Sequence, residues 1–123
     1  MKKLISILGS TGSVGISVIK IIDKKKNYFK INLLSSNNNY NKICDQIKKY
    51  NPNIFLIFNY KVFKKIKKKF KNSNVKIINK IDNKTYIKKN DITVSAIPGI
   101  AGLEPTLNLL KKSKKILIAN KES

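Results

Sequence analysis

Three glycines, Gly9, Gly12 and Gly15, stand three residues apart in the segment GSTGSVG, directly after a short apolar run. A glycine at the end of a strand permits a sharp turn, a second lets the backbone approach a pyrophosphate, and a third lets the helix pack closely on the strand. The start of the following helix would offer free N–H groups, and Thr11 and Ser13 add hydroxyl groups. The segment therefore indicates dinucleotide binding. Its glycine spacing is a variant of the usual fingerprint, and a purely structural turn is the alternative.

A second position bears on which dinucleotide is bound. NAD-binding proteins usually place an Asp or Glu about 20 residues beyond the glycines, where it holds the ribose 2′-hydroxyl. This chain has Ser36, Asn37, Asn38 and Asn39 there, and no acid. The sequence disfavours NAD and leaves room for a 2′-phosphate, to which Ser and Asn can donate and whose charge Lys42 can neutralise. The alternative is a plain polar loop in an Asn-rich chain.

The elements that would position these residues alternate along the chain. Short apolar runs predict strands at residues 4–8, 29–34, 54–58, 75–78, 92–97 and 115–119. Apolar residues at helical spacing predict helices between them, and Val14, Val18, Ile21 and Ile22 form the stripe of the first. The later helices carry stripes at 43–50, 62–70 and 103–110. Cys44 lies on the second stripe, which predicts a small buried residue rather than a nucleophile.

This alternation predicts one α/β domain over residues 1–123, with a Rossmann-like, doubly wound, mostly parallel sheet and helices on both faces. Right-handed crossovers place the carboxyl ends of parallel strands at one edge of the sheet. The segments GSTGSVG, SSNNN, PGIAG and NKES each follow a predicted strand. We therefore expect all four to line one crevice at that edge, where ligands bind in open α/β sheets.

The net charge of +21 raises nucleic acid as a partner. All 27 basic residues are lysine, however, and arginine is the residue that grips phosphate and bases with a bidentate fork. The excess extends to Ile and Asn, which share A/T-rich codons with lysine, so a biased genome accounts for the composition. We expect no specific nucleic-acid partner.

Compartment and membrane association are also constrained. No stretch approaches the ~20 apolar residues that span a bilayer, and the start of the chain lacks the apolar run of a signal peptide. A single cysteine cannot form an internal disulfide, which fits a reducing compartment. The sequence predicts a soluble cytoplasmic protein with no membrane partner.

Three motifs together carry a resemblance to a known family. The segments GSTGSVG, AIPGIAGL and ILIANKES, in this order across the full chain, resemble 1-deoxy-D-xylulose 5-phosphate reductoisomerase, the NADPH-dependent enzyme of the methylerythritol phosphate route to isoprenoids. The resemblance implies that Thr11, Gly12, Ser13 and Val14 contact the phosphates of NADPH. In typical members the loop after the second strand reads Gly-Lys-Asn, and only Asn39 of this chain matches it.

The closing motif supplies the remaining residues that the resemblance implies. Asn120 and Glu122 would contact NADPH, and Lys121 would contact the substrate. Enzymes of the family rearrange a ketose phosphate to a branched aldehyde and use Mg²⁺ or Mn²⁺. NADPH then reduces this aldehyde to 2-C-methyl-D-erythritol 4-phosphate. This chain offers six scattered acids and no paired cluster of metal ligands. In the family the metal carboxylates lie beyond NKES.

The resemblance therefore implies the N-terminal NADPH-binding domain of a longer enzyme, with no catalytic residue and no metal ligand in this segment. We expect it to be inactive alone, and we expect the full-length enzyme to be a homodimer. Two alternatives remain open. One is a stand-alone Rossmann-type nucleotide-binding module without catalysis, and the other is a basic nucleic-acid-binding protein.

Overall fold

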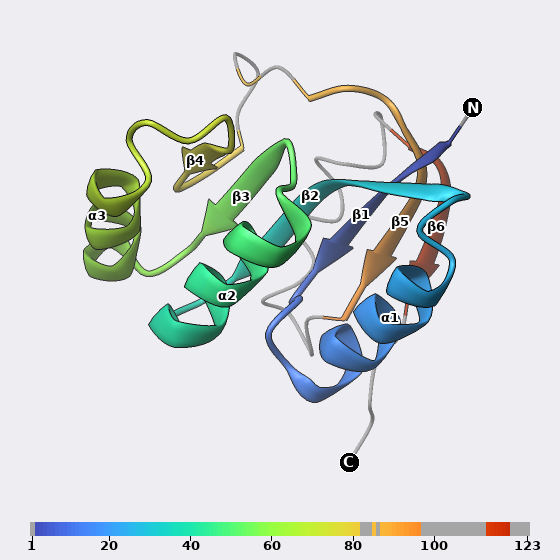
Figure 1. Ribbon diagram of the computed structural model, residues 1–123, viewed down its shortest axis with the longest axis horizontal. Helices are drawn as coiled ribbons and strands as arrows, with labels where there is room; N and C mark the ends of the chain where they lie inside the picture. Colours follow the sequence, from blue (N-terminus) through green and yellow to red (C-terminus); the bar gives the residue numbers. More distant parts are fainter. Residues whose placement is uncertain (1, 82–84, 86, 97–112, 119–123) are drawn as a thin grey trace.

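The fold is a single parallel sheet with helices packed on it (Figure 1). The structure is a computed structural model and describes residues 2–81, 85, 87–96 and 113–118. Its strands are β1 (Lys3–Leu8), β2 (Phe29–Ser36), β3 (Ile54–Ile57), β4 (Lys76–Ile78), β5 (Asn90–Ser95) and β6 (Ser113–Ile118). Its helices are α1 (Ser13–Lys24), α2 (Tyr40–Tyr50) and α3 (Tyr60–Lys69).

The six strands lie in the order β4-β3-β2-β1-β5-β6, and every neighbouring pair is parallel. The chain moves outward from β1 to β4 and then returns to place β5 on the other side of β1. The strand order therefore reverses between β1 and β5, which is the point at which open α/β sheets bind ligands. The register pairs Leu8 with Ser95, so these two strands end at the same edge.

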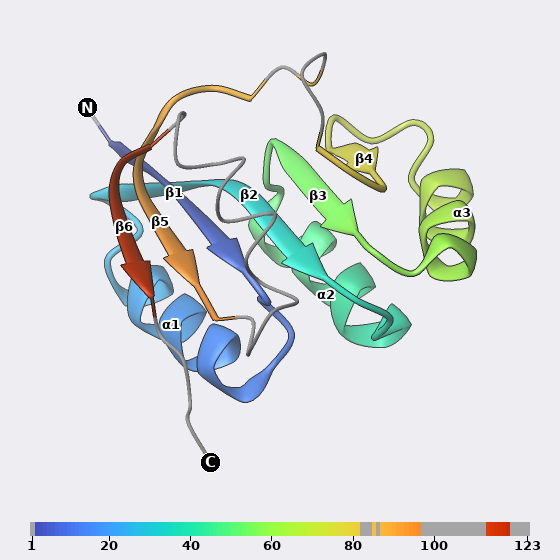
Figure 2. The same cartoon turned by 180° about the vertical axis from the view of Figure 1, so that it is seen from behind.

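The described helices lie on one side of the sheet. Figures 1 and 2, which view the molecule from opposite sides, both place α1 and α2 against the same face. Helix α3 lies at the end of the sheet, beside β3 and β4. The six-stranded Rossmann-like sheet is confirmed. The helix expected near residues 103–110 lies outside the described residues.

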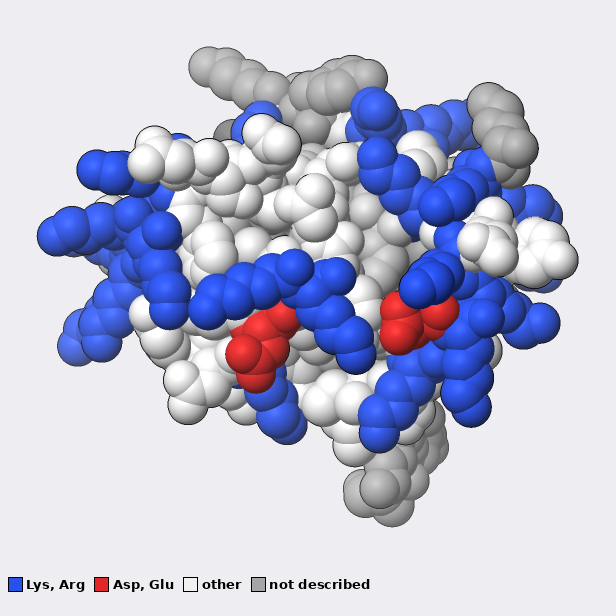
Figure 3. Space-filling model, viewed as in Figure 1, with Lys and Arg blue, Asp and Glu red and all other residues white. Residues whose placement is uncertain are grey.

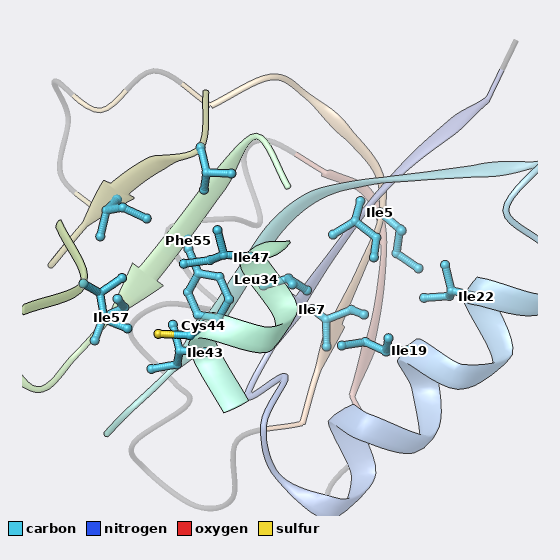
Figure 4. Packing of buried hydrophobic residues seen from close by; sticks show 14 of the residues in the cluster. Ile5, Ile7, Ile19, Ile22, Leu34, Ile43, Cys44, Ile47, Phe55 and Ile57 are labelled. Carbon is cyan, nitrogen blue, oxygen red and sulfur yellow. The ribbon is translucent and has the colours of Figure 1, made fainter. Parts of the chain in front are cut away.

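The main core fills the space between the sheet and these helices (Figure 4). Alternate residues of each strand point to opposite faces, so Ile7, Leu34 and Phe55 face the helices while their neighbours face away. They meet Ile19 of α1 and Ile43 of α2. The neighbouring residues Leu8, Leu33 and Ile54 belong to a second buried cluster. Cys44 is buried and has no disulfide partner, as expected.

The pairing of β1 with β2 is irregular at one position, where polar side chains are hydrogen-bonded to one another. The register between β1 and β2 shifts after Ile5, so Asn32 has no direct partner. Its side-chain amide donates to Oδ1 of Asn90 at 2.6 Å, and Ser6 donates to the same oxygen at 2.7 Å. The side chain of Asn53 donates to Oδ1 of Asn32 at 2.8 Å. These bonds satisfy polar groups that would be costly to bury unpaired.

Two details of the predicted elements were wrong. Ile21, which we expected on the apolar stripe of α1, is 60% exposed, whereas Ile19 is buried. Two residues span about 200° of a helix, so the two side chains point to nearly opposite sides. The predicted second strand, residues 29–34, also ends two residues too early. Ser35 and Ser36, which we expected in a polar loop, are buried residues of β2.

Candidate functional site

The segment GSTGSVG forms a tight turn from β1 into α1. Gly9 has a φ of 81°, in the region that glycine adopts without strain. The amide of Gly12 points back to the carbonyl of Gly9 at 3.4 Å, and α1 begins at Ser13. The turn lies at the carboxyl end of β1, beside the point where the strand order reverses.

The second and third glycines serve different purposes. A Cβ on Gly15 would stand 2.1 Å from the carbonyl oxygen of Gly9, so the helix can approach the turn only without a side chain there. A Cβ on Gly12 would meet nothing closer than the same oxygen at 3.8 Å, an ordinary contact. The protein's own packing does not require a glycine at position 12. A bare backbone at this position leaves space for a ligand.

The start of α1 differs from the starts of the other described helices. Asn39 caps α2 by accepting from the amide of Lys42, and Asn59 caps α3 by accepting from the amide of Val62. Gly12 occupies the corresponding position of α1 and provides no side-chain cap. The first-turn amides of a helix have no partners within it, so at α1 they face the turn uncapped and can receive an anion.

The turn is held rigidly against the end of β2. The amide of Gly9 donates to Oγ of Ser35 at 2.9 Å, and the amide of Ser10 donates to the Ser35 carbonyl at 2.7 Å. Gln46 of α2 then makes two bonds with Ser10, accepting from its hydroxyl at 2.7 Å and donating to its carbonyl at 2.9 Å. Ser10, Ser35 and Gln46 are all buried. Sheet and helix therefore fix the backbone that a ligand would meet.

Two further contacts join the turn to the end of β2 and to the start of α2. The hydroxyl groups of Thr11 and Ser36 are hydrogen-bonded at 2.6 Å. The ammonium group of Lys42, in the first turn of α2, donates to the carbonyl of Thr11 at 3.5 Å. The two polar segments singled out in the sequence therefore lie side by side.

The predicted site residues divide into two groups. Thr11, Gly12, Ser13 and Val14 lie together in the turn and first residues of α1. Asn39 lies across from them, and its side-chain oxygen is used to cap α2.

The second group comprises Asn120, Lys121 and Glu122, all of which lie outside the described residues. The preceding strand β6 ends at Ile118, which pairs with Ser95, and Ser95 pairs with Leu8. The segment PGIAG, at residues 98–102, also lies outside the described residues. Ala96, the last described residue before it, donates its amide to the Leu8 carbonyl at 2.8 Å.

Sequence reasoning missed the residues that hold the turn in place. Ser10 lies inside the quoted motif, yet it contacts Gln46 rather than facing a ligand. A signal for Gln46 was present, because it lies on the buried stripe of α2 with Ile43 and Ile47. A polar residue in that position needs a buried partner.

Two hollows on the surface are further places where a ligand could lie. A hollow of about 200 Å³ between α1 and α2 is lined by Ile16, Lys42 and Tyr50 among others, and adjoins the turn. A larger one of about 390 Å³ lies at the opposite edge, lined by Lys3, Lys25, Tyr28 and Phe29. Within the described ranges no three His, Cys, Asp or Glu residues gather as metal ligands, and no helix is long and apolar enough to cross a membrane.

Comparisons with known proteins point to one family. The family described as 1-deoxy-D-xylulose 5-phosphate reductoisomerase matches residues 5–123. The enzyme of this name from Pelagibacter ubique is 45% identical over 127 residues, covering 100% of this chain and 32% of the relative. The chain thus spans about a third of the length of the relatives it matches.

Solved structures agree. The reductoisomerase from Zymomonas mobilis in complex with NADPH superposes with a TM-score of 0.83 at 25% identity, covering 98% of this chain and 32% of that one. A reductoisomerase in complex with magnesium gives 0.84 at 28% identity, covering 100% and 32%. With the glycine turn in place at the end of β1, the chain belongs to the 1-deoxy-D-xylulose 5-phosphate reductoisomerase family.

Proposed function

We propose that this chain is the NADPH-binding domain of a 1-deoxy-D-xylulose 5-phosphate reductoisomerase. The observation that carries the proposal is the glycine turn, in which Gly15 allows helix α1 to touch the turn while Gly12 leaves its outer side bare. The uncapped amides of α1 then provide donors and a positive dipole end for a pyrophosphate. NADPH in the similar Zymomonas structure supports this choice of ligand.

The residues of the chain would act by binding and orienting the cofactor. Ser13 and Val14 would present their amide groups to the pyrophosphate, which would lie against the bare backbone of Gly12. Thr11 would contact it from the side of the turn that faces β2. Asn39 would contact the adenosine half of NADPH with its amide group, since its oxygen caps α2. Because Ser35 and Gln46 hold the turn, these donors need little rearrangement when the ligand arrives.

Beyond the described residues, Asn120 and Glu122 would contact NADPH and Lys121 the substrate, as in the family's closing motif. When bound, NADPH would supply the hydride that reduces the rearranged ketose phosphate. The described residues do not fit a metal site, so the Mg²⁺ or Mn²⁺ of the full-length enzyme would be held elsewhere. We further propose that the chain alone is inactive, that the full-length enzyme is a cytoplasmic homodimer, and that its product is 2-C-methyl-D-erythritol 4-phosphate.

Binding of nucleic acid is the second candidate, because the net charge is +21. The lysines, however, spread across the visible face of the molecule with acidic side chains between them (Figure 3). Lys49, for example, lies 4.0 Å from the carboxylate of Asp23. A dispersed charge of this kind favours solubility and weak non-specific attraction over a specific site.

Calorimetric titration of the chain with NADPH tests the proposal. We expect saturable binding that is lost in Gly12→Val, whose branched side chain would fill the space beside the first-turn amides. Ser17→Val is the matched control, because Ser17 is an exposed residue of the same helix and, within the described residues, its hydroxyl bonds only to the carbonyl of Ser13. Equal affinity in wild type and Gly12→Val would reject the proposed site.

Two further measurements separate the alternatives. Duplex DNA that binds tightly with a steep salt dependence, while NADPH does not bind, would favour a nucleic-acid function. An assay with 1-deoxy-D-xylulose 5-phosphate, NADPH and Mg²⁺ should show no turnover by this chain. Turnover would contradict the proposal that catalytic and metal-binding residues lie outside it.

A further inference from the structure

We infer that Lys42 is the residue that selects NADPH over NADH, by binding the 2′-phosphate that only NADPH carries. The inference rests on the proposed function, because it assigns a specificity residue to the same dinucleotide site. It starts from one contact, in which the ammonium group of Lys42 lies 3.5 Å from the carbonyl of Thr11 in the glycine turn.

The position of Lys42 in the fold places its charge on the adenosine side of the turn. Lys42 stands in the first turn of α2, directly after the segment that follows β2. The end of the second strand is where dinucleotide-binding folds recognise the ribose 2′-position. Thr11, which Lys42 contacts, is also the residue of the turn whose hydroxyl bonds to Ser36 at the end of β2. The pyrophosphate, by contrast, belongs at the start of α1, beyond Gly12.

The charges around this position are mostly positive, because Lys20, Lys42 and Lys49 line the hollow between α1 and α2 together with one carboxylate, that of Asp45. The end of β2 carries Ser35 and Ser36 followed by three asparagines, with no acid to hold a free ribose hydroxyl. Among the described residues, the ion pairs are Lys49 with Asp23 and Lys114 with Asp91, so the described part of the chain gives Lys42 no carboxylate within 4.0 Å. A lysine beside the turn, not neutralised by such a pair, can bind an anion without first breaking an ion pair.

The surroundings also hold the lysine close to the turn. The backbone amide of Lys42 donates to the side chain of Asn39 at 3.2 Å, which fixes the first turn of α2. Four residues further along the same helix, Gln46 is bonded to Ser10 of the turn. The glycine turn and the backbone of Lys42 are therefore parts of one hydrogen-bonded unit, from which the exposed lysine side chain reaches the turn.

The test compares NADPH and NADH for the wild-type chain and Lys42→Met. Methionine keeps an unbranched side chain that is one atom shorter and removes the charge. We expect the dissociation constant for NADPH to rise roughly 10- to 100-fold, as for the loss of one hydrogen bond to a charged group, while that for NADH stays within about twofold. Lys42→Arg, which retains the charge, should keep most of the preference for NADPH.

Lys48→Met is the matched control. Lys48 is exposed on the last turn of α2, about 9 Å along the helix axis from Lys42, so its removal lowers the net charge equally without touching the turn. Its preference for NADPH should equal that of the wild type. Circular dichroism melting of each variant checks that the fold is unchanged.

The remaining outcomes overturn the inference in distinguishable ways. Equal weakening of NADPH and NADH in Lys42→Met would assign the lysine to the pyrophosphate or to the integrity of the turn. An unchanged preference would leave it a solvated lysine. Failure of the folded wild-type chain to bind either dinucleotide would instead reject the proposed function on which the inference depends.

Discussion

At the residue scale, Gly15 and Gly12 differ in whether the fold itself requires a glycine. A methyl group at position 15 would collide with backbone atoms of Gly9 and Ser10, which cannot rotate away as a side chain can. At position 12 the same methyl group has room, and the φ of −78° suits any residue.

We therefore predict that Gly15→Ala destabilises the chain by about 1–3 kcal/mol or more, the usual cost of overpacking. Gly12→Ala should cost less than about 1 kcal/mol, from the loss of a favoured helix-capping residue. Urea unfolding of the two variants measures the difference. Equal destabilisation would mean that the turn is not packed as described.

Ser35 provides a second test at the same scale. Its hydroxyl oxygen accepts from the amide of Gly9, so Ser35→Ala removes the partner of a partly buried donor. Leaving such a donor unpaired costs about 1–3 kcal/mol. Ser17→Ala, at an exposed serine of α1, should change the unfolding free energy by less than about 0.5 kcal/mol. If thermal melting fails to separate these two variants, Ser35 does not hold the turn.

At the scale of elements, helix α1 shows which features the spacing of apolar residues can predict and which it cannot. Isoleucines stand at positions 16, 19, 21 and 22, so several apolar stripes can be drawn on the helix. The structure uses the stripe through Gly15, Ile19 and Ile22, because Gly15 must face the turn. The existence of the helix was predictable from apolar spacing, whereas its orientation depended on the contact of Gly15 with Gly9, a residue of the turn outside the helix.

The end of β2 was mispredicted for a related reason. Serine is common in loops, so the sequence favoured ending the strand before Ser35. Both serines instead complete the strand because the glycine turn supplies partners for their polar groups. The six strands and their mostly parallel arrangement could be predicted from the alternation of apolar runs and helices. The bonds between Ser10 and Gln46 depend on tertiary contacts that no local pattern encodes.

A matched pair of substitutions tests the assigned face of α1. Ile19→Ala removes a side chain that is 2% exposed and should cost about 2–5 kcal/mol, from lost burial and the cavity left behind. Ile21→Ala removes the same atoms from a side chain that is 60% exposed and should change stability by less than about 0.5 kcal/mol. Chemical denaturation gives both values, and the reverse ranking would show that α1 is rotated.

At the scale of the whole molecule, Asp91 joins three strands at the edge opposite the glycine turn. Its carboxylate accepts from the amide of Leu4 at 2.8 Å and lies 3.4 Å from the ammonium group of Lys114. The hydrogen bond from Leu4, with a smaller contribution from Lys114, lowers the pKa of Asp91 from its ordinary value of 3.8. The starts of β1, β5 and β6 thus meet at one carboxylate.

This lowered pKa predicts a pH dependence of stability. The folded state favours the charged carboxylate, so its contribution is complete well above pH 3.8 and is lost as the pH falls through the lower folded pKa. Asp91→Asn should therefore be less stable than the wild type at pH 6, and the difference should shrink towards pH 3. Asp45→Asn, at an exposed residue of α2, serves as the charge-matched control. A wild-type advantage over Asp91→Asn that is the same at both pH values would contradict the assigned contacts.

The proposed function requires a dinucleotide to lie at the carboxyl edge of the sheet, against the glycine turn. The most direct measurement is the change in backbone amide NMR signals of the isotope-labelled chain during titration with NADPH. We predict that the largest shifts fall on residues 9–14 and 36–42, the turn and the segment after β2. Shifts concentrated instead at the opposite edge, around Lys3, Lys25, Tyr28 and Phe29, or no saturable shifts at all, would contradict it.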